Sequence, residues 1–78
     1  MGDEPLEISP GVTVDQRVSF GKPVVKGTRI SVDIVLHQLA AGVDYAEMEQ
    51  EYGLSRQQLL DVLRYAADLV SGELVRAD

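Results

Sequence analysis

Apolar residues recur every three or four positions along three segments of the second half of the chain. This spacing places them on one face of an α-helix, so the pattern predicts three amphipathic helices. The first has its apolar stripe at Val32, Val35, Leu36 and Leu39. The second is short and carries Tyr45, Met48 and Tyr52. The third runs from about residue 56 to about residue 70, with a stripe of Leu59, Val62, Leu63, Ala66 and Val70.

Capping residues mark the ends of the first two predicted helices. The hydroxyl of Ser31 can accept a free backbone N–H at the start of the first, and Gly42 closes that helix. Asp44, with Glu47 three residues later, has the pattern of a capping box at the start of the second. Gly53 ends the second helix. These signals fix the helix boundaries to within a few residues.

Gly53, Leu54 and Ser55 form the turn between the second and third helices. Gly53 allows the bend, Leu54 anchors it in the core, and Ser55 caps the third helix with Gln58 at the capping-box position. Two helices joined by a short, glycine-containing turn are typical of the helix-turn-helix. In such motifs the position four before the glycine is often Ala, and here it is Glu49. Either the second helix is rotated slightly, or Glu49 lies at the rim.

The first third of the chain has a β-type pattern. Val12 and Val14 alternate with polar residues, and Val18, Phe20, Val24 and Val25 continue the β-type composition. Gly21 and Pro23 interrupt it, so a strand here is short or lies at an edge. We expect a short β hairpin or arm over residues 11–30, which pairs with another chain's arm or packs on the helices.

The predicted fold is therefore mainly α: a trihelical, homeodomain-like helix-turn-helix domain with a short N-terminal β arm. Residues 1–10 are expected to form a flexible acidic leader, residues 11–70 the single domain, and residues 71–78 a short tail.

The composition indicates that this small domain needs a partner for stability. The chain has 78 residues and no cysteine, so a small core must hold it without disulfides. A core of this size supplies only roughly 3–5 kcal/mol. We therefore expect a homodimer or an obligate partner. No apolar run is long enough to span a bilayer, and the acidic first residues lack the features of a secretory signal, so a cytoplasmic location is the default.

Charge is distributed in blocks of one sign along a chain whose net charge is −6. Residues 17–30 contain four cations and no acid, and residues 31–55 contain five acids and no cation. Such blocks favour oriented contacts, either between parts of the domain or with a partner. An acidic chain also argues against strong non-specific binding to nucleic acid, which depends on neutralising phosphates.

A DNA-reading role has specific candidate residues. In a helix-turn-helix the start of the second helix enters the major groove, which here selects Arg56 and Gln57, with Arg64 on the outer face. The candidate phosphate contacts are the cations of the arm: Lys22, Lys26 and Arg29. Acidic residues on the same two helices oppose this role: Glu47, Glu49, Glu51, Asp61 and Asp68. A trihelical core with a solvated polar face explains the same pattern.

The sequence predicts neither an enzyme nor a bound metal or cofactor. The segment GKPVVKGT has its Lys-Gly-Thr in the wrong order and its glycines at the wrong spacing for a phosphate loop. His37 has no second His or Cys beside it, which favours a packed or interface histidine over a metal ligand. No pair of nucleophile and base stands out.

The chain resembles a known family through three segments. GKPVVKGTRISV is distinctive, a helix ending in LAAG follows, and DYAEM…YGLS leads into the last helix. These residues resemble the prokaryotic family called domain of unknown function 433, regarded as VapB-type antitoxins, over about residues 11–68. The resemblance implies a dimeric, trihelical helix-turn-helix domain with a short β arm and a partner toxin of the PIN-like nuclease class.

Two functional hypotheses follow. In the first, the protein is an antitoxin that binds and blocks a toxin ribonuclease and, as a dimer, binds its own operator DNA weakly. A basic nuclease suits an acidic inhibitor because complementary charge speeds association. The candidate toxin-binding surfaces are the acidic second helix and the tail after Gly72, and the cationic arm would reach past its own subunit to phosphates or to a second subunit's acidic helix. In the second hypothesis, the protein is a dimeric interaction module of the same fold that does not bind DNA.

Overall fold

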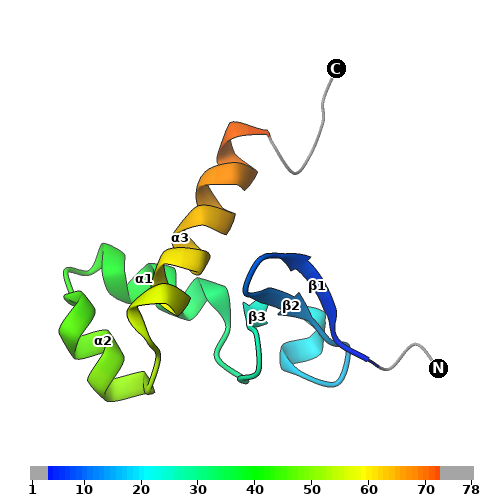
Figure 1. Ribbon diagram of the computed structural model, residues 1–78, viewed down its shortest axis with the longest axis horizontal. Helices are drawn as coiled ribbons and strands as arrows, with labels where there is room; N and C mark the ends of the chain where they lie inside the picture. The colour runs from blue at the N-terminus through cyan, green and yellow to red at the C-terminus, as the bar shows by residue number, and fades with distance from the viewer. Residues whose placement is uncertain (1–3, 73–78) are drawn as a thin grey trace.

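The computed structural model describes residues 4–72 (Figure 1). It is a small α-rich domain with an N-terminal three-stranded sheet. The strands are β1 (Leu6–Ser9), β2 (Val12–Val14) and β3 (Val24–Val25), with a short 3-10 turn, η1 (Ser19–Gly21), before β3. The helices are α1 (Val32–Ala40), α2 (Tyr45–Tyr52) and α3 (Arg56–Ser71). All three helices and their capping residues lie where the sequence predicts them. Most of the predicted tail lies outside the described residues.

The sheet is antiparallel in the order β1–β2–β3, and β1 corrects the predicted leader. Leu6 pairs with Val14, and Glu7 pairs with Thr13. Within the predicted leader, residues 6–9 are therefore a strand of the domain. The acidic composition before residue 10 concealed this strand, although Ile8 packs against the core.

The sheet packs on the helices of its own chain. Val12 of β2 and Val25 of β3 are fully buried in one cluster with Val35, Leu59 and Val62. Of the two predicted arrangements, the one found is the arm packed on the helices. The apolar residues that hold the arm in place, Val12 and Val25, are buried against helices of the same chain.

Residues 18–20 do not continue a strand as their composition predicts. Val18 forms only an isolated bridge with Asp15 across a tight turn. Ser19 and Phe20 then have left-handed backbone conformations, with φ of 51° and 57°. The chain reverses there, and Phe20 is 97% exposed.

The helices close the core over the sheet. Met48 of α2 and Leu59 and Val62 of α3 are fully buried, and Leu54 lies with them in the core, as predicted. Figure 1 shows the last turns of α3, drawn in orange, extending beyond the rest of the domain. Val70, expected in the core stripe of α3, is accordingly 88% exposed.

Candidate partner and nucleic-acid interface

The turn between α2 and α3 is held by contacts between near neighbours. Gly53 caps α2 with a left-handed φ of 70°, and its N–H donates to the carbonyl of Glu49 at 2.9 Å. The Ser55 hydroxyl accepts the backbone N–H of Gln58 at 3.1 Å, and the Gln58 side chain accepts the N–H of Ser55 at 2.7 Å. This reciprocal pair is the predicted capping box. Together with the buried Leu54, it fixes how α3 leaves α2.

The outer side of α2 is acidic. Asp44 caps the helix by accepting the N–H of Glu47 at 2.8 Å, which is the first half of the predicted capping box. Glu47 and Glu51 are exposed, whereas Glu49 is half-buried at the rim. Glu49 thus takes the second of its two predicted positions, and Met48 fills the core beside it. Negative charge at the start of a helix also opposes the helix dipole favourably.

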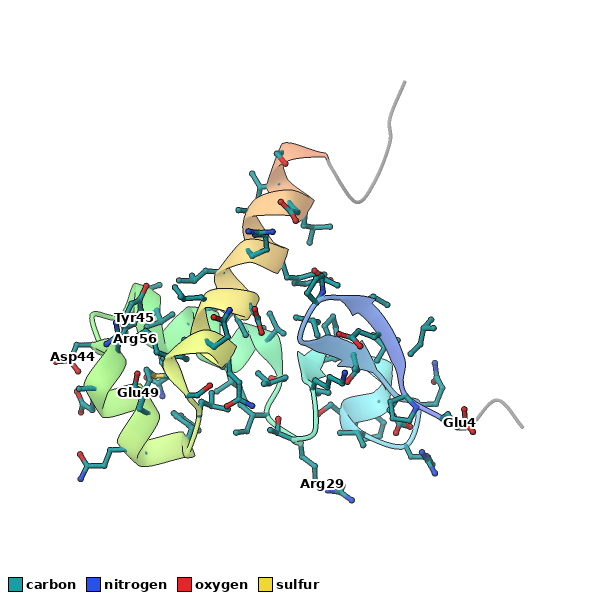
Figure 2. The ribbon with its side chains drawn as sticks, viewed as in Figure 1. Glu4, Arg29, Asp44, Tyr45, Glu49 and Arg56 are labelled. Atoms are coloured by element: carbon teal, nitrogen blue, oxygen red, sulfur yellow. The ribbon has the colours of Figure 1, made fainter. Side chains whose placement is uncertain are left out.

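Arg56, the first residue of α3, turns back towards α2. Its Nε donates to Glu49 Oε2 at 3.1 Å, and its guanidinium lies 4.6 Å from the centre of the Tyr45 ring. Figure 2 shows these three side chains gathered at the α2 side of the molecule. A surface ion pair of this kind contributes about 0–1 kcal/mol. Its main consequence is that the Arg56 side chain points towards α2, because its guanidinium contacts Glu49 and Tyr45.

A hollow opens beside this cluster. It measures about 700 Å³ and lies between the end of α1, the start of α2 and α3. Its walls combine apolar side chains with the charged Asp44 and Arg56. Such a mixture suits a side chain of a protein partner better than a phosphate, because the only cation in the lining is already paired with Glu49.

The other two residues of α3 that were predicted to contact DNA bases, Gln57 and Arg64, lie along a second hollow. Gln57 donates to Asp61 Oδ1 at 3.0 Å, one turn further along the helix. Arg64 is exposed and, with Gln57 and Asp61, lines a hollow of about 520 Å³ that Pro10 of the β1–β2 turn completes. The predicted DNA-reading side chains therefore share their surface with a carboxylate.

The cations of the arm are not gathered with those of α3. Lys26 Nζ lies 2.9 Å from Glu7 Oε1, and Lys22 Nζ lies 3.9 Å from Asp33 Oδ2. In Figure 2 Arg29 lies at the lower edge of the molecule, away from Arg56. The six candidate nucleic-acid contacts thus do not form a single basic patch.

The acids that meet these cations have lowered pKa values. The backbone N–H of Gly11, and then Lys26, lower the pKa of Glu7. The hydroxyl of Ser31, more than the charge of Lys22, lowers the pKa of Asp33. These carboxylates are charged at neutral pH and neutralise part of the basic block. Within one domain, Lys26 and Lys22 of the basic block therefore meet Glu7 and Asp33, whereas the acids of α2 form no ion pair with that block among residues 4–72.

Sequence reasoning missed two features. It assigned Tyr45 only to the apolar face of the second helix, whereas the ring also supports Arg56. The signal was available, because both residues occupy the first position of their helices on either side of the turn. It also missed the exposure of Phe20, which depends on backbone angles that no periodicity reports.

Residues 4–72 contain neither a metal-binding cluster nor a membrane-spanning helix. No group of three or more His, Cys, Asp or Glu side chains there could hold a metal ion. His37 is exposed on α1, where its Nδ1 lies 2.7 Å from the carbonyl oxygen of Asp33. Over the same residues, no helix has both the length and the apolar character needed to cross a bilayer.

Comparison with known proteins places the chain in a family. No curated protein and no solved structure matches it. Residues 12–66 match the model of a family described as "Protein of unknown function (DUF433)". The match begins in β2, includes the cationic arm, α1, α2 and the turn after it, and ends within α3. The chain therefore belongs to the DUF433 family.

Proposed function

We propose that this protein is an antitoxin that binds a PIN-like ribonuclease toxin and blocks it through the acidic outer face of α2. In such an antitoxin, α2, the turn and α3 would form a helix-turn-helix of the VapB type. Residues 12–66 match the DUF433 family, and the sequence resemblance described above, which regards that family as VapB-type antitoxins, supports this class.

The observation that carries the proposal is that most cations of the described residues are paired, whereas two acids of α2 are not. Ion pairs within residues 4–72 occupy four cations: Arg17, Lys22, Lys26 and Arg56. On α2, in contrast, Glu47 and Glu51 are exposed and form no ion pair with the described residues. The net charge of −6 adds to the negative field around this helix. A basic nuclease surface would be attracted to it, and its association rate would rise accordingly.

Toxin inhibition can be tested with the product of the adjacent reading frame. We expect that product to cleave RNA, and we expect this protein to suppress the cleavage when present in equimolar amounts. Glu51→Lys should weaken the complex by about tenfold, or ~1.4 kcal/mol. Position 51 lies in the last turn of α2, where a lysine suits the helix dipole, so the fold is retained.

The matched control is Glu4→Lys, which makes the same change in charge on another side of the molecule (Figure 2). It should leave inhibition nearly unchanged. Equal weakening by both variants would reduce the effect to net charge. An RNA-cleaving neighbour that this protein neither binds nor inhibits would refute the antitoxin proposal.

The second candidate is the dimeric interaction module that does not bind DNA. The internal contacts of Arg56 and Gln57 favour it, because base reading would require breaking both. A gel-shift assay with the upstream DNA separates the two candidates. Operator reading requires that Gln57→Ala and Arg64→Ala remove sequence preference, while Lys26→Ala weakens all sequences alike. Absence of any shift at low salt would leave the interaction module as the better description.

A further inference from the structure

An apolar groove lies between α1 and α3, and no residue of α2 lines it. It measures about 230 Å³ and is lined by Val32 and Leu36 of α1 and by Tyr65 and Leu69 of α3. Lys22 and Asp33 stand at its polar edge, with Nζ and Oδ2 3.9 Å apart. Leu69 is 44% exposed, although its neighbours in the groove are apolar. The groove therefore presents an apolar floor with a balanced pair of charges.

Phe20 is the complementary feature. It precedes Lys22 of the groove edge by two residues, and 97% of its surface is exposed. Its φ of 57° is an outlier for a bulky residue, and Ser19 beside it has a φ of 51°. Such conformations cost free energy and cluster at binding sites, where the strained geometry has a use. Here the strained turn leaves an aromatic ring in water, two residues before the edge of an apolar groove.

We propose that two copies of this chain form a two-fold symmetric dimer in which Phe20 of each copy enters the groove of the other. A projection and a groove close together on one chain have the geometry of an isologous interface, because one rotation fills both grooves at once. Phenylalanine is also among the residues enriched at protein interfaces.

Charge selects a second copy as the occupant. The groove edge carries one cation, Lys22, and one anion, Asp33, so two copies meet there without net repulsion. The outer face of α2, with Glu47 and Glu51, would repel its own copy. The dimer uses no residue of α2, so the inference holds whether or not the protein is an antitoxin.

The first test measures molar mass by sedimentation equilibrium over a range of concentrations. The wild type should be a dimer, and Phe20→Ser should raise the dimer dissociation constant at least about tenfold. The matched control is Leu6→Ser, which removes another exposed hydrophobic side chain, 63% exposed, and should leave the dimer intact. Because Phe20 makes so little contact within the chain, circular dichroism should show an unchanged fold. A wild type that stays monomeric, or a Phe20→Ser dimer as tight as the wild type, overturns the proposal.

The second test determines which surfaces meet. The chain has no cysteine, so single cysteines can be introduced without interference. Phe20→Cys and Leu69→Cys proteins of different mass, mixed and oxidised, should form the mixed disulfide. Leu6→Cys mixed with Leu69→Cys should not. Equal cross-linking in the two mixtures would mean that the dimer forms through some other surface, and would also overturn the proposal.

Discussion

The arm of residues 6–30 and the corner formed by α2, its turn and the start of α3 are held together in different ways. In the corner, the cap contacts of Ser55 and Gln58 and of Asp44 and Glu47 join residues three positions apart. In the arm, the ion pair between Lys26 and Glu7 joins residues nineteen positions apart. The corner is therefore specified locally, whereas the arm exists only after distant segments have met.

This difference separates the two surfaces proposed to bind partners. The acidic face of α2 belongs to a locally fixed corner, so it is ready to bind without rearrangement. Phe20 belongs to the arm, in a turn with unfavourable backbone angles. Binding at Phe20 would remove an exposed apolar ring from water, whereas binding at α2 relies mainly on charge. Three sets of substitutions test whether the arm and the corner differ in how they are stabilised.

The largest expected effect comes from breaking the corner at its centre. Met48 is fully buried, and Met48→Ala should cost about 2–5 kcal/mol through lost burial and the cavity left behind. That loss is comparable with the whole stability of a core this size, roughly 3–5 kcal/mol. We expect the variant to be largely unfolded in a urea titration. Gln50→Ala, on the exposed side of the same helix, is the control, and a loss below about 1 kcal/mol for Met48→Ala would contradict the prediction.

A pair of glycines compares the arm with the corner directly. Both Gly11 and Gly53 have positive φ, 81° and 70°. A Cβ at Gly53 would meet nothing within 4 Å, so Gly53→Ala should cost only the backbone penalty of about 1–2 kcal/mol. A Cβ at Gly11 would collide with the side chain of Asp61, which Gln57 holds in place.

Gly11→Ala should therefore lower the urea midpoint more than Gly53→Ala does. The double variant Gly11→Ala with Asp61→Ala should recover part of the difference, because it removes the colliding carboxylate. Equal midpoints for the two single variants would mean that the β1–β2 turn moves away from α3 without cost.

The corner could be predicted from the sequence, and the reason is physical. Each helix start depends on a side chain and an N–H three residues later, so Ser31, Asp44 and Ser55 mark the boundaries by themselves. Leu54 could likewise be placed in the core, because the turn that buries it is fixed by its two neighbours.

The arm could be predicted only in part. In strand β1, Leu6 and Ile8 alternate with polar residues, but this pattern covers only four residues after an acidic segment. The pairing with β2 is what defines the strand. The prediction of the candidate site was incomplete for a similar reason. The sequence identified Arg56 and Lys26 as cations of the site, but it did not predict that they pair with Glu49 and Glu7. Partners across the fold follow from tertiary packing, and a list of residue types along the chain does not contain it.

The smallest expected effect concerns the ion pair that closes the turn after β2. Two hydrogen bonds from the Arg17 side chain, and one from its backbone N–H, lower the pKa of Asp15 below its ordinary value of 3.8. Since the folded pKa lies below the unfolded one, this carboxylate stabilises the fold above about pH 4. That contribution is lost as the pH falls through the folded pKa.

Urea midpoints measured between about pH 6 and pH 2 should therefore fall less steeply with acid for Asp15→Asn than for the wild type. Arg17→Gln should flatten the curve similarly, because it removes the side-chain donors while leaving the carboxylate. The lowered pKa values of Glu7 and Asp33 leave some acid sensitivity in both variants. An Asp15→Asn curve parallel to that of the wild type would show that this pair does not contribute to the stability of the arm.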